Sequence, residues 1–206
     1  MLVIIPFKPT DPKSRLSIVL SRKEREELAR AMLLDVLTAL DSFDCKIKIL
    51  STHPFNLEGY EVEVDDRELD VAINSRIKGE TAVIMSDLPL LNKKTLEKFF
   101  ETEGDVIIAP GRRGGTNMIL VRNPNFKVSY YYCSFLKHIE IARRLNLKVE
   151  IFDSFYASVD VDTPDDLLEI LIHGRGKKSY SYLQSLGFRI LFEKEPKLVR
   201  ISNTSP

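Results

Sequence analysis

Short apolar runs of strand length alternate with helical patterns along the chain. Residues 2–5 (LVII) form a continuous apolar run, which predicts a fully buried strand. From 22 to 41, apolar side chains recur every three or four residues, as on the buried face of an amphipathic helix, and residues 22–27 are predicted to be solvated. The same patterns predict strands over 46–50, 60–64, 81–85, 105–109, 118–121, 148–152 and 157–161, and helices over 67–78, 92–100, 134–145 and 163–173.

Two of the predicted helices begin with strong capping signals. Ser21 is followed three residues later by Glu24, which is the spacing of a capping box. Thr163 precedes Pro164 and two acidic residues, which suit the first turn of a helix. Strand–helix alternation at this spacing predicts an α/β fold, with a mostly parallel central sheet flanked by helices.

The pattern divides the chain into a domain and an appendage. Residues 1–174 carry the alternation and are predicted to form one domain. Residues 175–206 differ, because a basic stretch leads to a short helical pattern (SYLQSL) and a strand-like run (FRILFE). We expect this appendage to pack back on the domain or to form a subunit contact, so a homodimer stays among the alternatives.

Composition narrows the classes of function. Thirty basic residues balance thirty acidic ones, so no whole-molecule field favours nucleic acid or a membrane surface. Apolar runs fall well short of the ~20 residues of a membrane span, and the two cysteines, Cys45 and Cys133, have no metal-ligand spacing. The sequence predicts a cytoplasmic protein without a nucleic-acid or membrane partner.

Three aspartates follow predicted strands, where ligands of parallel sheets bind. In VIMSDLPLL, Asp87 comes directly after a buried strand that Pro89 ends, and Asp160 and Asp162 lie at the end of another. Carboxylates brought close together repel unless a cation joins them, and Mg²⁺ binds one or two carboxylates together with substrate phosphates. We therefore expect a Mg²⁺ site here. In the alternative, Asp87 ends its strand in a turn and Asp162 helps to cap a helix.

Two loops at the same edge offer positive charge and polar contacts. In PFKPTDPKSRL (6–16), Lys8, Lys13 and Arg15 could balance a triphosphate, or could be a solvated basic loop. In APGRRGGTN (109–117), the glycines let a ligand approach the backbone, unless this is an ordinary connection between strands. A P-loop signature is missing, which argues against a kinase of that type. The second loop also carries Arg112, Arg113 and Thr116 as candidate contacts for an anionic substrate.

The motifs PFKPTDPKSRL, SDLPLL, APGRRGGTNMIL and VDVDTPDDLL resemble those of the 2-phospho-L-lactate guanylyltransferase family, which acts in the biosynthesis of the deazaflavin coenzyme factor 420. The resemblance covers residues 1 to about 173. It implies a nucleotidyltransferase fold of the glycosyltransferase-A type, with GTP and Mg²⁺ as partners. It further implies that Asp87, Asp162 and Asp160 bind metal, that Lys13 holds the triphosphate, and that Thr116, Ser134 and Tyr131 contact the phosphorylated acid.

The implied reaction is attack by a phosphate oxygen of 2-phospholactate on the α-phosphorus of GTP, with pyrophosphate leaving. That oxygen is already ionised near neutral pH, because the second pKa of a phosphomonoester is about 6. No general base is then needed, and His53, His138 and His173 are interpreted as surface or helix positions. Phosphoenolpyruvate or another small phosphorylated acid remains an alternative acceptor, and a non-catalytic nucleotide-binding module is the alternative from another class.

Overall fold

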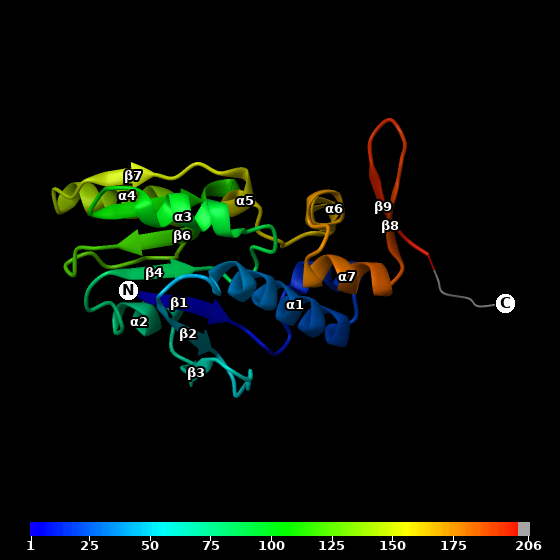
Figure 1. The fold of residues 1–206 in the computed structure, drawn as a ribbon, viewed down its shortest axis with the longest axis horizontal. Helices are drawn as coiled ribbons and strands as arrows, with labels where there is room; N and C mark the ends of the chain where they lie inside the picture. Colours follow the sequence, from blue (N-terminus) through cyan, green and yellow to red (C-terminus); the bar gives the residue numbers. More distant parts are fainter. Residues whose placement is uncertain (202–206) are drawn as a thin grey trace.

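The computed structural model describes residues 1–201, whose centre is a seven-stranded sheet (Figure 1). All neighbouring strands are parallel except β6, which runs antiparallel to both β4 and β5. The strands, in the order β3-β2-β1-β4-β6-β5-β7, are β1 (Leu2–Phe7), β2 (Lys46–Ser51), β3 (Glu61–Val64), β4 (Thr81–Ile84), β5 (Val106–Pro110), β6 (Thr116–Val121) and β7 (Val149–Ile151). The predicted mostly parallel sheet is confirmed.

Helices cover both faces of this sheet and bury its apolar side chains. On one face α1 (Arg22–Leu40) and α3 (Lys93–Glu101) pack against alternate residues of the central strands. On the other face α2 (Leu69–Asn74) and α4 (Ser134–Arg144) pack against the residues between them. Because both faces are covered, β4 and β6 are buried along their whole length, including the polar residues Thr116 and Asn117 that begin β6.

The capping signals read from the sequence are present. The Ser21 side chain accepts a hydrogen bond from the backbone N–H of Glu24, and Glu24 accepts one from Ser21 in return. Asn92 caps α3 through the backbone N–H of Thr95. Thr163 and Asp166 form a second capping box at the start of α6 (Pro164–His173).

One predicted strand is wrong. Residues 157–161 do not pair in the sheet: α5 (Phe155–Ser158) is a short helical turn, closed by hydrogen bonds from Ala157 and Ser158 to the carbonyl of Ser154. The chain beyond it is fixed to the end of β4 by one backbone hydrogen bond, from Val161 to Asp87 (3.2 Å). Its alternating side chains are buried. The alternation of apolar and polar residues therefore predicted correctly which side chains are buried, but wrongly predicted that the segment pairs as a strand.

The C-terminal segment packs on α1 through the helix α7 (Lys178–Ser185). Buried Asp35 of α1 accepts hydrogen bonds from the backbone N–H groups of Lys178 (2.7 Å) and Ser179 (3.0 Å) and from the Ser179 hydroxyl (2.6 Å). Leu183 and Phe188 join a core with residues of α1. This part of the predicted appendage is continuous with the body of the protein.

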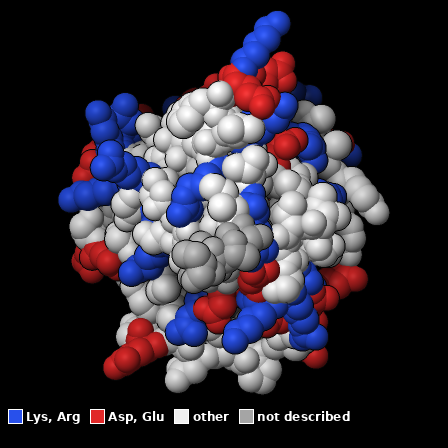
Figure 2. Space-filling view, turned by 90° about the vertical axis from the view of Figure 1, so that its right-hand side faces the viewer, with Lys and Arg blue, Asp and Glu red and all other residues white. Residues whose placement is uncertain are grey.

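A two-stranded hairpin, β8 (Phe188–Leu191) and β9 (Lys197–Arg200), follows α7 and stands away from the sheet (Figure 1). Only its first strand was predicted. Basic and acidic side chains are interspersed on the face that carries it, as the balanced composition leads one to expect (Figure 2). Within residues 1–201 we find no helix with the length and apolar character needed to span a membrane.

Replacing Asp35 tests how α7 is held. Asp35→Ala leaves the backbone N–H and hydroxyl of buried Ser179, and the partly buried N–H of Lys178, without their acceptor, so we expect the free energy of unfolding to fall by about 3 kcal/mol. Urea unfolding followed by circular dichroism measures this loss. Asp44→Ala, at an exposed position, is the matched control. Equal unfolding free energies for the two variants would contradict this role of Asp35.

Candidate active site

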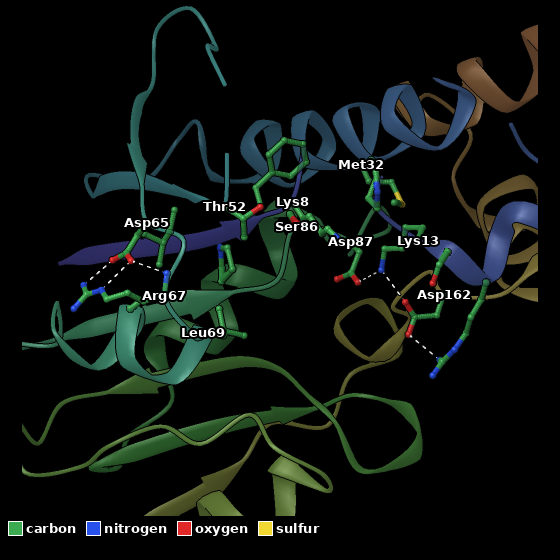
Figure 3. Close-up of a pocket in the computed structure, with 18 residues that line it drawn as sticks. Lys8, Lys13, Met32, Thr52, Asp65, Arg67, Leu69, Ser86, Asp87 and Asp162 are labelled. Atoms are coloured by element: carbon green, nitrogen blue, oxygen red, sulfur yellow. Dashed lines mark hydrogen bonds and ion pairs between the residues drawn. The ribbon is translucent and has the colours of Figure 1, made fainter. Parts of the chain in front are cut away.

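A cavity of about 540 Å³ opens at the carboxyl ends of β1, β2 and β4 (Figure 3). One end is formed by the loop after β1, the turn after β4 and the segment before α6, and the other by residues that follow β2 and β3 together with α2. Segments distant in sequence therefore line the same cavity, because most of them follow strands that are neighbours in the sheet. Its polar lining residues are Lys8, Lys13, Ser14, Arg15, Thr52, Asp65, Arg67, Ser86, Asp87 and Asp162.

Lys13 lies between two of the predicted aspartates (Figure 3). Its ammonium nitrogen contacts Oδ2 of Asp87 and lies 2.8 Å from Oδ1 of Asp162. Burial by itself lowers the pKa of Lys13, but the two carboxylates outweigh it and hold that pKa above its ordinary value. The Arg15 guanidinium lies 3.6 Å from the other oxygen of Asp162. Lys13 therefore stays charged and offsets one of the two negative charges, and the second cation near the pair is Arg15.

A buried arginine of α1 holds the loop that presents Lys13. Both Lys13 (φ 52°) and Asp11 (φ 46°) adopt the left-handed backbone conformation, which is strained for residues with a side chain. Arg25 donates hydrogen bonds to the carbonyl of Pro12 and to Oδ1 of Asp11 (2.6 Å). The prediction that residues 22–27 are all solvated is wrong here, since Arg25 is buried by its contacts with this loop.

The third aspartate, Asp160, lies beside the pair and has other partners. Its Oδ1 is 3.4 Å from the amide nitrogen of Asn117 and 3.8 Å from Nε of Arg112. Burial and the nearby negative charge of Asp87 raise the pKa of Asp160. A carboxylate whose pKa is raised by its neighbours gains from a nearby cation.

Asp87 supplies a test of whether a cation fits. Its Oδ1 is buried and has no hydrogen-bond partner within residues 1–201, although a buried carboxylate oxygen normally has one. The surrounding donors are carboxylate oxygens, which hard divalent cations prefer. In the described part of the chain, no three His, Cys, Asp or Glu side chains are arranged around a single point as a metal site. With Lys13 in place, two aspartates bind its ammonium and Asp160 faces Arg112 and Asn117.

The candidates for acceptor binding form two groups, and none of them lines the cavity. Thr116 and Ser134 are buried together, with their hydroxyl oxygens 3.2 Å apart, because Thr116 begins β6 and Ser134 begins α4. Tyr131 is half exposed and instead donates to Oε2 of Glu68 at the start of α2 (2.5 Å). The structure thus brings Thr116 and Ser134 together and directs Tyr131 elsewhere.

The two arginines of the glycine-containing loop also differ. Arg112 bridges to the α6 cap through Oδ1 of Asp166 (2.7 Å) and the carbonyl of Asp160. Arg113 is exposed and has a left-handed backbone (φ 61°). In the same loop, Gly111 makes room for a neighbouring side chain, since a Cβ there would lie 2.1 Å from Oδ1 of Asn117. The glycine thus allows Asn117 to reach Asp160.

A family model described as "Guanylyl transferase CofC like" matches residues 1–204. The chain belongs to this family. A 2-phospho-L-lactate guanylyltransferase of Archaeoglobus profundus is 71% identical over the full length of both chains. The enzyme of the same name from Archaeoglobus fulgidus is 54% identical and covers 97% of each. The predicted family is confirmed.

Solved structures show the same fold at low identity. One from Desulfovibrio desulfuricans G20, assigned to the nucleotide-diphospho-sugar transferases, has a TM-score of 0.74 at 18% identity, over 89% of this chain and 94% of that one. A nucleotidyl transferase from Methanothermobacter has a TM-score of 0.55 at 9% identity, over 89% and 98%. These likenesses show that this member of the guanylyl transferase family has a nucleotidyltransferase fold.

Sequence reasoning missed several residues around the site. Thr52 and Asp65 line the far end of the cavity, and each directly follows a strand, so the rule that located Asp87 could have located them. Arg25 and His138 carried no such signal, because each owes its position to a partner in a different element. His138 was interpreted as a surface or helix position. It lies in α4 but is fully buried against Thr116.

The buried imidazole predicts a specific pH dependence of stability. Burial lowers the pKa of His138 from 6.5 to about 4, so between these values the unfolded chain binds a proton that the native chain does not. The free energy of unfolding should therefore fall as the pH drops through this window, by at most about 1.4 kcal/mol per pH unit. Urea unfolding at pH 7, 5.5 and 4.5 measures it. His138→Gln should flatten this part of the dependence, and exposed His53→Gln is the control. An unchanged slope in His138→Gln would contradict the assignment.

Proposed function

We propose that this chain transfers GMP from GTP to 2-phospho-L-lactate, which gives lactyl-2-diphospho-5'-guanosine and pyrophosphate. The carrying observation is the placement of Lys13 between Asp87 and Asp162 at one end of the cavity. A cation and an acidic pair at the carboxyl edge of a parallel sheet suit a nucleoside triphosphate with its metal. The names of relatives that match the whole chain support the same reaction.

In the proposed reaction a phosphate oxygen of phospholactate attacks the α-phosphorus of GTP. The new P–O bond forms while the bond from the α-phosphorus to the β-bridging oxygen breaks, and pyrophosphate leaves with that electron pair. The nucleophile is an ionised phosphate, so no side chain needs to remove a proton. The described lining of the cavity agrees, since it contains no histidine.

The main barrier is then electrostatic, because two anions must meet and negative charge must move to the leaving group. Lys13 is the residue best placed to bind the β- and γ-phosphates, with Lys8 and Arg15 on the same loop as further positive charges. We infer that Lys13 binds the two aspartates in the nucleotide-free protein and turns to the triphosphate when nucleotide and metal enter. The Lys13 ammonium therefore binds the aspartates without nucleotide and the phosphates with nucleotide bound.

Asp87 and Asp162, joined by Asp160, are the residues that would hold a divalent cation, for which we propose Mg²⁺. The buried Oδ1 of Asp87, which has no hydrogen-bond partner within residues 1–201, and the carboxylate oxygens around it fit such an ion. When bound, the cation supplies positive charge next to the transferred phosphate. In its absence the same carboxylates need Lys13 to offset their repulsion.

The acceptor acid is proposed to bind next to these carboxylates. Thr116 and Ser134 offer hydroxyl groups at the N-terminus of α4, where the helix dipole favours an anion. Arg112 and Arg113 are exposed and add positive charge, and Tyr131 stays a candidate contact, although its hydroxyl donates to Glu68 in this structure. Asn117 connects this region to the metal side through Asp160.

Pyrophosphate release tests the proposal. We expect release only with GTP among the four nucleoside triphosphates, only with Mg²⁺, and faster with 2-phospholactate than with phosphoenolpyruvate. Asp87→Asn should keep its fold by circular dichroism but fall below a tenth of the wild-type rate, because it removes a charge from the proposed cation site. Asp44→Asn, at an exposed site, is the control.

Three results would count against this reading. Faster turnover with phosphoenolpyruvate than with 2-phospholactate would make phosphoenolpyruvate the acceptor. Pyrophosphate release at the wild-type rate by Asp87→Asn would show that Asp87 does not hold the cation. A failure of every nucleotide and acid combination would refute the activity.

A further inference from the structure

A chain of four polar groups lies behind the proposed acceptor site. His138 is fully buried, and its Nδ1 lies 3.0 Å from the hydroxyl oxygen of Thr116. Its Nε2 accepts a hydrogen bond from the backbone N–H of Ser129 (2.9 Å). The Thr116 hydroxyl in turn lies 3.2 Å from that of Ser134. Both imidazole nitrogens are therefore committed to polar partners inside the protein.

These contacts fix the tautomer of the ring. A backbone N–H can only donate, so Nε2 of His138 must be the unprotonated nitrogen. A neutral imidazole has one N–H, which then sits on Nδ1 and donates to Thr116. The surroundings keep the ring neutral, since the rings of Phe126 and Tyr130 pack against it at centroid distances of 5.9 and 5.3 Å and burial lowers its pKa.

The tautomer decides which way the hydroxyl groups donate. The Thr116 oxygen accepts from His138, so its own proton is not needed for that bond. Thr116 and Ser134 have two hydroxyl protons between them and share one hydrogen bond. One proton is left over and has no other acceptor among the hydrogen bonds described for residues 1–201. The pair is thus set to donate to a group outside it.

We propose that His138 is a positioning residue for the acceptor, which orients the Thr116–Ser134 pair so that it donates a hydrogen bond to a carboxylate or phosphate oxygen of the acid. This rests on the proposed function, which places the acid at these hydroxyls. A hydrogen bond to an anionic oxygen is stronger than one between neutral groups, so a fixed donor favours an acidic acceptor. With the other tautomer, Nδ1 of His138 would accept from Thr116, and the two hydroxyl groups would have no proton left to donate to an anion.

The elements explain why these residues meet. Ser134 and His138 are four residues apart on α4 and so lie on the same face of that helix, which packs beside the loop before β6. Thr116 and Asn117 are successive residues of β6 and point to opposite faces of the sheet. One reaches His138 and the other reaches Asp160. The donor pair and the contact with Asp160 are thereby carried by neighbouring residues of β6, on opposite faces of the sheet.

Two substitutions separate the roles of the two ring nitrogens. In His138→Asn the side-chain amide can replace Nδ1–H as donor to Thr116, whereas in His138→Gln the longer side chain can replace Nε2 as acceptor for Ser129. We expect His138→Gln to raise KM for the acceptor acid at least tenfold, with KM for GTP within twofold of wild type. His138→Asn should restore acceptor KM to within threefold. Unchanged acceptor KM in His138→Gln overturns the proposal, as does a parallel rise in both KM values.

A double-mutant cycle adds a readout that a purely structural role would not move. In a Thr116→Val background the hydroxyl to be oriented is gone, so His138→Gln should not raise acceptor KM further. Independent effects of the two substitutions would overturn the proposal. The wild type is measured alongside. A wild type without acid-dependent pyrophosphate release refutes the proposed function itself, whereas an active wild type with an unaffected His138→Gln refutes only the role of His138.

The tautomer can also be read without any substitution. Nitrogen NMR of the ¹⁵N-histidine-labelled wild type should show His138 as the neutral Nδ1–H form at pH 7. A ring protonated on Nε2, or on both nitrogens, would overturn the proposal even if the variants failed to fold.

Discussion

The contact of one ammonium with two carboxylates joins three separate segments at the carboxyl edge of the sheet. Lys13, Asp87 and Asp162 come from the loop after β1, the turn after β4 and the segment before α6. Two carboxylates this close are tolerated only with a cation between them. The strand order puts β1 and β4 side by side, and a backbone hydrogen bond from Val161 to Asp87 holds the third segment against the second. The fold thus delivers three distant charges to one place.

The same arrangement explains why the loop after β1 is strained and firmly held. Lys13 has a left-handed backbone, and buried Arg25 stabilises its loop through Pro12 and Asp11. Residues that sit in unfavourable backbone regions persist only when their surroundings fix them, and they gather at functional sites. A nucleotide that replaced the carboxylates as partner of Lys13 would meet a side chain that is already in position.

Much of the fold could be predicted from the sequence, because its signals are local. Apolar periodicity and capping residues such as Ser21 and Thr163 depend on neighbours a few positions away, and they located most helices and strands. Lys13, Asp87 and Asp162 were also found from the sequence, because ligands of parallel sheets bind where the strands end and because the family motifs contain these residues. Residues 157–161 were wrongly predicted to be a strand. Alternation of apolar and polar residues shows which side chains are buried, and here a helical turn and the segment after it bury them without pairing in the sheet.

The remaining features depend on partners that no local pattern shows. Arg25 sits in a charged stretch and is buried only because a loop ten or more residues earlier folds over it. His138 reads as one more helix residue until Thr116 and Ser129 supply opposite hydrogen-bond roles for its two nitrogens. The strand β9 lies in a polar stretch and gains its partner β8 from a hairpin outside the main core.

Divalent-cation affinity in the absence of nucleotide tests most directly whether Lys13 stands in for a metal between Asp87 and Asp162. Mn²⁺ titration followed by electron paramagnetic resonance can compare the wild type with Lys13→Met, using Lys8→Met as a control on the same loop. Since removal of the ammonium leaves the two carboxylates without the cation that binds both of them, we expect Lys13→Met to bind Mn²⁺ at least tenfold more tightly than either other protein. Equal or weaker binding by Lys13→Met would contradict the competition of lysine and metal for this pair.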